Sequence, residues 1–115
     1  MTAAIDSRIV DAVCLAANYP EIIKAGVFGS YARGEQTAGS DIDILFEYSG
    51  GNSRGGDGSF ILGVLEYIEE ASGALKRKFG ERMKTDFISL NGLIESNNNK
   101  VRDNILESVV WVYEK

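Results

Sequence analysis

Apolar residues near the N-terminus recur at helical spacing, at positions Ile5, Ile9, Val13, Ala16 and Ala17. This spacing predicts an amphipathic helix that ends near Asn18, because Pro20 follows closely. The next apolar run, Ile22–Phe28, is short and rich in β-branched residues, so we predict a strand that leads into Gly29.

A short helix and a second strand are predicted next. Ser30 suits the N-cap position of a one-turn helix, and Gly34 suits its C-terminal end. Residues 41–48 are predicted to form a strand, in which successive side chains point to opposite faces, so that apolar side chains lie on the face opposite to the two aspartates. The apolar face would consist of Ile42, Ile44 and Phe46.

Residues 49–59 are rich in glycine and predict a surface loop. This loop is either a tolerated insertion or a flap over a bound ligand. Ser59 would then cap a long helix that ends in the basic run at residues 76–78, where cations complement the helix dipole. The apolar face of this helix would consist of Ile61, Val64, Leu65, Ile68, Ala71 and Leu75.

The C-terminal part is predicted to hold a strand at residues 83–90, a helix at 97–107 and, at 109–113, either a strand or a helix end. Strands that alternate with helices predict an α/β (α+β) fold, with a small mixed β-sheet and helices mainly on one face. We expect residues 1–115 to form one domain.

Composition and charge narrow the classes of function. Hydrophobic residues make up 44% and charged residues 25%, which is typical of a globular fold. The net charge of -5 disfavours a protein that binds long nucleic acid through its phosphates. The chain has no histidine, which excludes histidine metal sites and histidine general bases. We see neither a signal peptide nor an apolar run long enough for a bilayer, so we expect no membrane association and a cytoplasmic protein.

Two aspartates open the second predicted strand. Asp41 and Asp43 are two positions apart and would project from the same face, where they repel each other unless a cation lies between them. Mg²⁺ prefers such oxygen ligands, and a catalytic site usually needs a third carboxylate from a neighbouring strand. We favour Asp86, which enters an otherwise apolar strand, over Glu47, Asp57 or Glu81. The alternative is that Asp86 is a solvated residue at the start of its strand.

An anion-binding turn is predicted just before these aspartates. Gly29 allows close approach of the backbone, and Ser30 offers both a hydroxyl and a backbone N–H to a phosphate. Arg33, one turn further, would point to the same site, and Ser40 directly precedes the first aspartate. Carboxylates beside a phosphate-binding turn indicate chemistry on a nucleoside triphosphate.

The motif Gly-Ser-x-Ala-Arg-Gly at residues 29–34, followed by Ser-Asp-Ile-Asp at 40–43, closely resembles the nucleotidyltransferase superfamily of DNA polymerase β type. In particular it resembles the minimal nucleotidyltransferases. Residues 85–88 and 101–114 extend the resemblance over nearly the whole chain. It implies the polymerase β-like nucleotidyltransferase fold, in which Asp41, Asp43 and Asp86 hold two Mg²⁺ ions. Gly29 and Ser30 would bind the β- and γ-phosphates.

The resemblance also implies a reaction and a partner. An acceptor hydroxyl attacks the α-phosphorus of a nucleotide and releases pyrophosphate, and Asp86 is a candidate for accepting the proton. Minimal members are typically antitoxins that transfer AMP from ATP to a tyrosine of a HEPN-type ribonuclease toxin, and we expect this function here. An acidic surface would suit a basic partner.

Two alternatives stay open at this point. The chain could be a non-catalytic binding module that neutralises its partner by occlusion, with Tyr31, Tyr48, Trp111 and Tyr113 as interface residues; core packing explains these aromatic residues equally well. It could also be a nucleotidyltransferase that acts on a small molecule such as an antibiotic, although the short chain leaves no second lobe to enclose a sugar.

Overall fold

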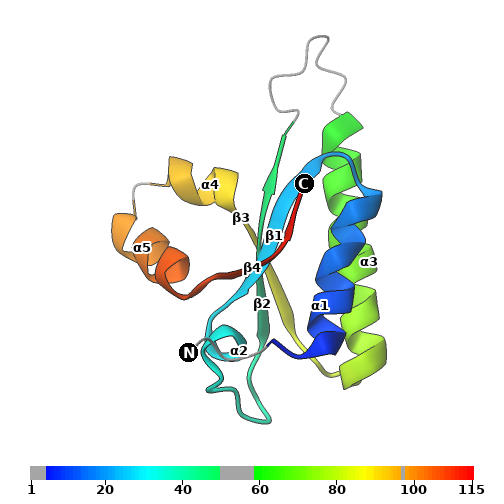
Figure 1. The fold of residues 1–115 in the computed structure, drawn as a ribbon, viewed down its shortest axis with the longest axis vertical. Helices are drawn as coiled ribbons and strands as arrows, with labels where there is room; N and C mark the ends of the chain where they lie inside the picture. The colour runs from blue at the N-terminus through cyan, green and yellow to red at the C-terminus, as the bar shows by residue number, and fades with distance from the viewer. Residues whose placement is uncertain (1–4, 50–58, 97) are drawn as a thin grey trace.

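The chain folds around a mixed sheet (Figure 1). The strand order is β3-β2-β1-β4. This computed structural model describes residues 5–49, 59–96 and 98–115. The strands are β1 (Ile22–Phe28), β2 (Ile42–Tyr48), β3 (Thr85–Ser89) and β4 (Val110–Glu114). β1 runs antiparallel to both β2 and β4, whereas β2 runs parallel to β3. The sequence-based prediction of a small mixed sheet is confirmed.

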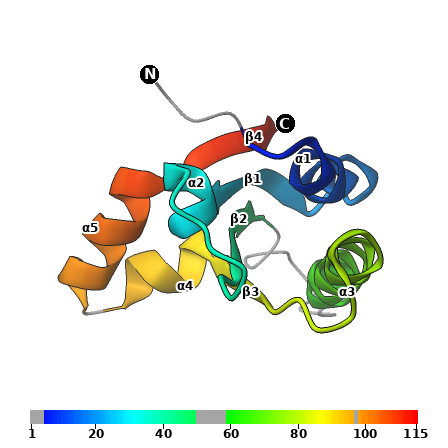
Figure 2. The same cartoon turned by 90° about the horizontal axis from the view of Figure 1, so that it is seen from below.

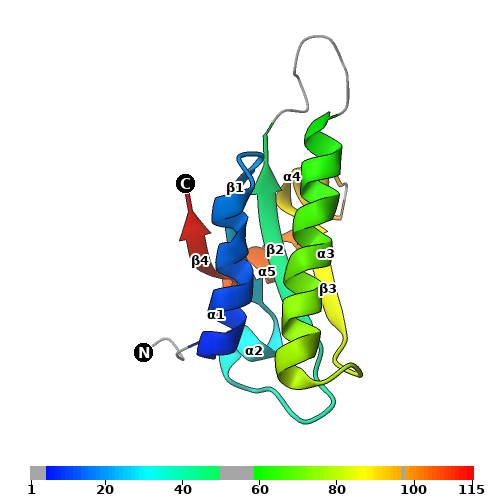
Figure 3. The same cartoon turned by 90° about the vertical axis from the view of Figure 1, so that its right-hand side faces the viewer.

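Helices lie on both faces of the sheet. They are α1 (Ser7–Val13), the 3-10 helix η1 (Cys14–Asn18), α2 (Ser30–Arg33), α3 (Ser59–Phe79), α4 (Leu90–Glu95) and α5 (Asn99–Ser108). α1 and α3 lie side by side over one face (Figure 3), and α4 and α5 lie on the other side (Figure 2). The predicted first helix ends at Asn18 as expected, with its last part as 3-10 helix.

The larger core lies between the sheet and the α1–α3 pair. Tyr67 of α3 is fully buried there, and its hydroxyl donates a hydrogen bond to the Val13 carbonyl at 3.0 Å. A smaller core on the opposite face joins the sheet to α4 and α5 and consists of Phe28, Leu45, Leu93 and Ile105. The helices therefore lie mainly, but not solely, on one face, and the smaller core fixes the position of α5 relative to β1.

The predicted apolar face of α3 is partly wrong. Ile61 and Leu65 are 49% and 56% exposed, although the pattern placed both in the core. The buried side chains are Val64, Tyr67, Ala71, Ala74 and Leu75. The helix is rotated so that the large ring of Tyr67 is buried with its hydroxyl hydrogen-bonded, which a buried tyrosine requires.

The C-terminal boundaries also differ from the predictions. The strand predicted at residues 83–90 covers only Thr85–Ser89, because the Ser89 hydroxyl accepts a hydrogen bond from the Gly92 N–H at 3.1 Å and begins α4. The last helix starts at Asn99 rather than at residue 97, with the Asn98 side chain capping it. Residues 109–113, which were predicted as either a strand or a helix end, mostly form the strand β4.

The glycine-rich loop predicted at residues 49–59 lies almost wholly outside the described residues. Within the described part of the chain, no helix is both long and apolar enough to cross a membrane.

Candidate active site

The sheet brings Asp43 and Asp86 together. They are register partners on the parallel strands β2 and β3, so their side chains project from the same face. Asp41 immediately precedes β2 and lies two positions before Asp43, which places it on that face as well. Asp43 is half-buried, whereas Asp41 and Asp86 are exposed. All three carboxylates thus lie at one end of the β2–β3 pair.

Asp43 has an unusual electrostatic environment. Burial, followed by the negative charges of Asp86 and Asp41, raises the pKa of Asp43 to about 6. The Arg33 guanidinium opposes this rise only in part. The ionised form of Asp43 therefore lacks sufficient positive charge nearby, which is the condition in which a carboxylate gains most from a bound cation.

The described residues contain no group of three or more Asp, Glu, Cys or His side chains arranged to hold a metal ion as they stand. The predicted metal-binding role of the three aspartates is therefore not established by their positions. Their chemistry does suit Mg²⁺, because all the available donors are hard carboxylate oxygens. Asp41 and Asp86 are exposed, so rotation of their side chains toward Asp43 would displace no core residue.

Gly29 forms the turn between β1 and α2. Its φ of 77° and ψ of -151° are accessible essentially only to glycine. A Cβ atom at this position would overlap the Asp43 carboxylate oxygen Oδ2. The backbone thus passes directly against the acidic side chain. The sequence predicted a close approach of this glycine to a phosphate, and its contact with Asp43 was not predicted.

The predicted N-cap is wrong by one position. Gly29 is the N-cap of α2, its carbonyl accepts the N–H groups of Ala32 and Arg33, and Ser30 is the first helical residue. Gly34, in the left-handed conformation with φ of 73°, ends the helix as predicted. Because α2 has only four residues, its dipole is small, and any anion would be bound chiefly by backbone N–H groups and the Ser30 hydroxyl.

Ser108, at the end of α5, was not predicted to be near the site. Its hydroxyl oxygen accepts a hydrogen bond from the Gly29 N–H at 3.3 Å, and the hydroxyl donates to the Ile105 carbonyl at 3.3 Å. The Gly29 N–H is therefore already bonded within the protein. This leaves the N–H groups of Ser30 and Tyr31, which make no intrahelical bond at the first turn, as the candidate phosphate donors.

Arg33 and Ser40 occupy different surroundings. Arg33 Nε lies 3.2 Å from Glu35 Oε1 in an exposed ion pair, which is a weak interaction that a phosphate could replace. The Ser40 hydroxyl oxygen accepts a hydrogen bond from the Thr37 N–H at 2.8 Å. Ser40 thus orders the turn that leads into Asp41.

A cavity of about 250 Å³ adjoins Asp41 on the side of α3. It is lined by residues 38–41 and by Phe79, Arg82, Met83 and Lys84. Two cationic side chains beside an acidic cluster give this end of the molecule a mixed charge, although the whole chain is acidic.

Comparisons with known proteins identify the family of the chain. The nucleotidyltransferase domain family matches residues 7–112. A candidate protein adenylyltransferase of Methanocaldococcus jannaschii is 36% identical over 86 residues, which are 75% of this chain and 72% of that protein.

Solved structures share the fold. A candidate minimal nucleotidyltransferase is similar over 90% of this chain and 88% of its own, with a TM-score of 0.61 and 23% identity. A mutant of the toxin–antitoxin complex MntA-HpeT is similar over 93% of this chain and 73% of its own (TM-score 0.60, 16% identity). A toxin–antitoxin structure with AMP-PNP is similar over 95% of this chain and 73% of its own (TM-score 0.58, 18% identity). The chain belongs to the nucleotidyltransferase domain family and is a nucleotidyltransferase enzyme.

Proposed function

We propose that this enzyme transfers AMP from ATP to a hydroxyl group, that of a tyrosine, on a HEPN-type ribonuclease toxin, and so acts as its antitoxin. The observation that carries the proposal is the alignment of Asp43 with Asp86, with Asp41 beside them and the Gly29 turn against Asp43. The choice of a protein acceptor is supported by the named activity of the M. jannaschii relative. The toxin is suggested by the toxin–antitoxin structures that share the fold.

In the proposed reaction, the acceptor oxygen forms a bond to the α-phosphorus of ATP while the bond to the pyrophosphate oxygen breaks. Asp41, Asp43 and Asp86 would hold two Mg²⁺ ions. When bound, these ions would neutralise charge on the triphosphate and lower the pKa of the acceptor hydroxyl. The hydroxyl proton leaves to a carboxylate, and the exposed Asp86 is our candidate for accepting it.

The β- and γ-phosphates would be bound by the backbone N–H groups at the start of α2 and by the Ser30 hydroxyl. Arg33 would exchange its exposed ion pair with Glu35 for a phosphate oxygen. We assign Ser40 an indirect part, because its hydroxyl orders the turn before Asp41. The reaction consumes ATP, so the cytoplasm is the compartment in which we expect it.

Label transfer tests the proposal. The chain is incubated with ATP labelled at the α-phosphate, Mg²⁺ and the product of the adjacent gene, and the proteins are then separated and digested. We expect label on a tyrosine of the neighbouring protein, and none with Asp41→Asn/Asp43→Asn. The control is Ser7→Ala, which changes an exposed residue on α1. This variant should transfer AMP as wild type does. Complex formation without transfer, or transfer only to a small molecule such as an aminoglycoside, would contradict the proposal.

A further inference from the structure

The N-terminal half of α3 carries exposed apolar side chains. Ile61, Leu62 and Leu65 are 49%, 63% and 56% exposed, and their spacing of three and four residues makes them neighbours on the helix surface. We call these three residues the α3 apolar patch. Grouped apolar residues of this kind mark interaction sites more often than isolated ones do.

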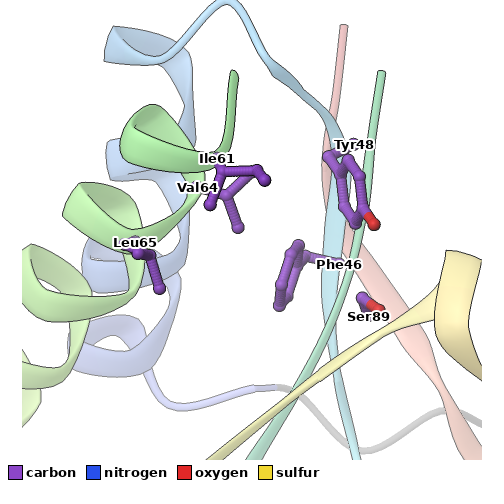
Figure 4. A pocket seen from close by; sticks show the side chains of 6 residues that line it. All are labelled: Phe46, Tyr48, Ile61, Val64, Leu65 and Ser89. Atoms are coloured by element: carbon purple, nitrogen blue, oxygen red, sulfur yellow. The ribbon is translucent and has the colours of Figure 1, made fainter. Parts of the chain in front are cut away.

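The α3 apolar patch borders a cavity of about 320 Å³ between α3 and the ends of β2 and β3 (Figure 4). Phe46 and Tyr48 of β2 and Ser89 of β3 face Ile61, Val64 and Leu65 of α3 across this cavity. The lining is mostly apolar, and the cavity is open to the surface. It could therefore receive an apolar side chain from another molecule.

Acidic residues flank the α3 apolar patch on its C-terminal side. Glu66, Glu69 and Glu70 are all exposed and line a second hollow together with Tyr19, Gly73 and Arg77, so three carboxylates face one guanidinium there. The Tyr19 hydroxyl donates a hydrogen bond to the Glu70 carboxylate, which leaves Glu66 and Glu69 as the more available charges. An apolar surface beside carboxylates is complementary to apolar residues flanked by lysine or arginine.

A second copy of this chain would fit this surface poorly. A parallel two-fold pairing of two copies through the α3 apolar patch would bring the glutamates of both copies close together, because they all lie on the C-terminal side of the patch, about one helical turn away. Each copy also carries a net charge of -5. Both effects oppose self-association and favour a partner with positive charge.

We propose that the α3 apolar patch and Glu66, Glu69 and Glu70 form the docking site for an amphipathic helix of a partner protein, with apolar side chains flanked by basic residues. Only the identification of this partner as the acceptor protein rests on the proposed function. Phe46 and Tyr48 lie toward the far end of β2 from Asp41, about 20 Å away at ~3.3 Å per residue. Docking here would leave the aspartates uncovered, so binding of the partner and transfer of AMP can be measured separately.

The test measures binding of the purified product of the adjacent gene by titration calorimetry. We expect Leu62→Asp/Leu65→Asp to weaken binding at least tenfold. Glu66→Lys/Glu69→Lys should also weaken binding and reduce its dependence on salt. The matched control is Ile94→Asp/Val101→Asp, which changes side chains of similar exposure, 56% and 44%, on α4 and α5. It should bind within twofold of wild type.

Unchanged affinity in the α3 variants would overturn the inference, as would failure of the wild-type chain to bind. So would a wild-type dimer that the α3 variants convert to monomer, since a second copy would then occupy the surface. Thermal unfolding verifies that the variants fold, as expected for exposed positions. If the α3 variants lose binding but wild type transfers no AMP, the docking site stands and the proposed function fails. If AMP is transferred but the α3 variants bind normally, the proposed function stands and the docking site fails.

Discussion

Asp43 of β2 and Asp86 of β3 are direct register partners in a parallel pair of strands, with Asp41 on the same face. Like charges on directly opposite residues of neighbouring strands are destabilising, and here Asp43 is also half-buried. Burial of Asp43, and after it the negative charges of Asp86 and Asp41, raises the pKa of the Asp43 carboxyl group to about 6. Arrangements that cost stability in this way are concentrated at functional sites.

The first prediction concerns stability and pH. The pKa of Asp43 is about 6 in the folded chain and near 3.8 in the unfolded chain, so the folded state binds more protons between these values. The stabilising effect is complete below pH 3.8 and is lost as pH rises through 6. We expect the unfolding temperature of the metal-free protein to fall between pH 4.5 and pH 7 more steeply in wild type than in Asp43→Asn. Equal slopes in the two proteins would show that Asp43 is not the group responsible.

The turn at Gly29 gives a second prediction. Gly29→Ala places a Cβ atom against the Asp43 carboxylate and forces a non-glycine residue into a conformation that costs about 1–3 kcal/mol. Denaturant unfolding should reveal a loss of stability of this order together with loss of nucleotide binding. Gly39→Ala is a suitable control, since a Cβ there meets nothing within 4 Å. Comparable stability of the two variants would refute the tight fit.

Ser108 provides the third prediction. Ser108→Ala removes the acceptor for the Gly29 N–H and should destabilise the protein by about 1 kcal/mol. If Ser108 positions the turn, the variant should also bind ATP more weakly, and Ser108→Thr, which keeps the hydroxyl, should restore affinity. A variant that is less stable but binds ATP normally would restrict Ser108 to a structural role.

Local patterns predicted the parts of this fold that depend on local chemistry. β1 was predicted as residues 22–28 and found there, because its apolar run is bounded by a proline before it and a glycine turn after it. The alternation in β2 predicted correctly that Ile42, Ile44 and Phe46 lie in the larger core, away from the aspartates. The nucleotidyltransferase family was also predicted, from the motif at residues 29–43 and the strand that carries Asp86.

Features that depend on tertiary packing were missed. The contact between Gly29 and Ser108 joins residues 79 positions apart, and no local signal marks it. The rotation of α3 depends on the burial of Tyr67, so the exposure of Ile61 and Leu65 could not be read from periodicity. α4 was also not predicted. Ser89 is a local signal for its N-cap, but Ser89 was assigned to the interior of the strand predicted at residues 83–90.

The central claim is that Asp41, Asp43 and Asp86 bind Mg²⁺ together with a nucleotide at the Gly29 turn. Titration calorimetry with AMP-PNP, with and without Mg²⁺, tests it most directly. We predict binding that requires Mg²⁺ in the wild-type chain and is lost in both Asp43→Asn and Asp86→Asn, while the exposed change Ser7→Ala has no effect. Binding of equal strength without Mg²⁺, or in either aspartate variant, would contradict the claim.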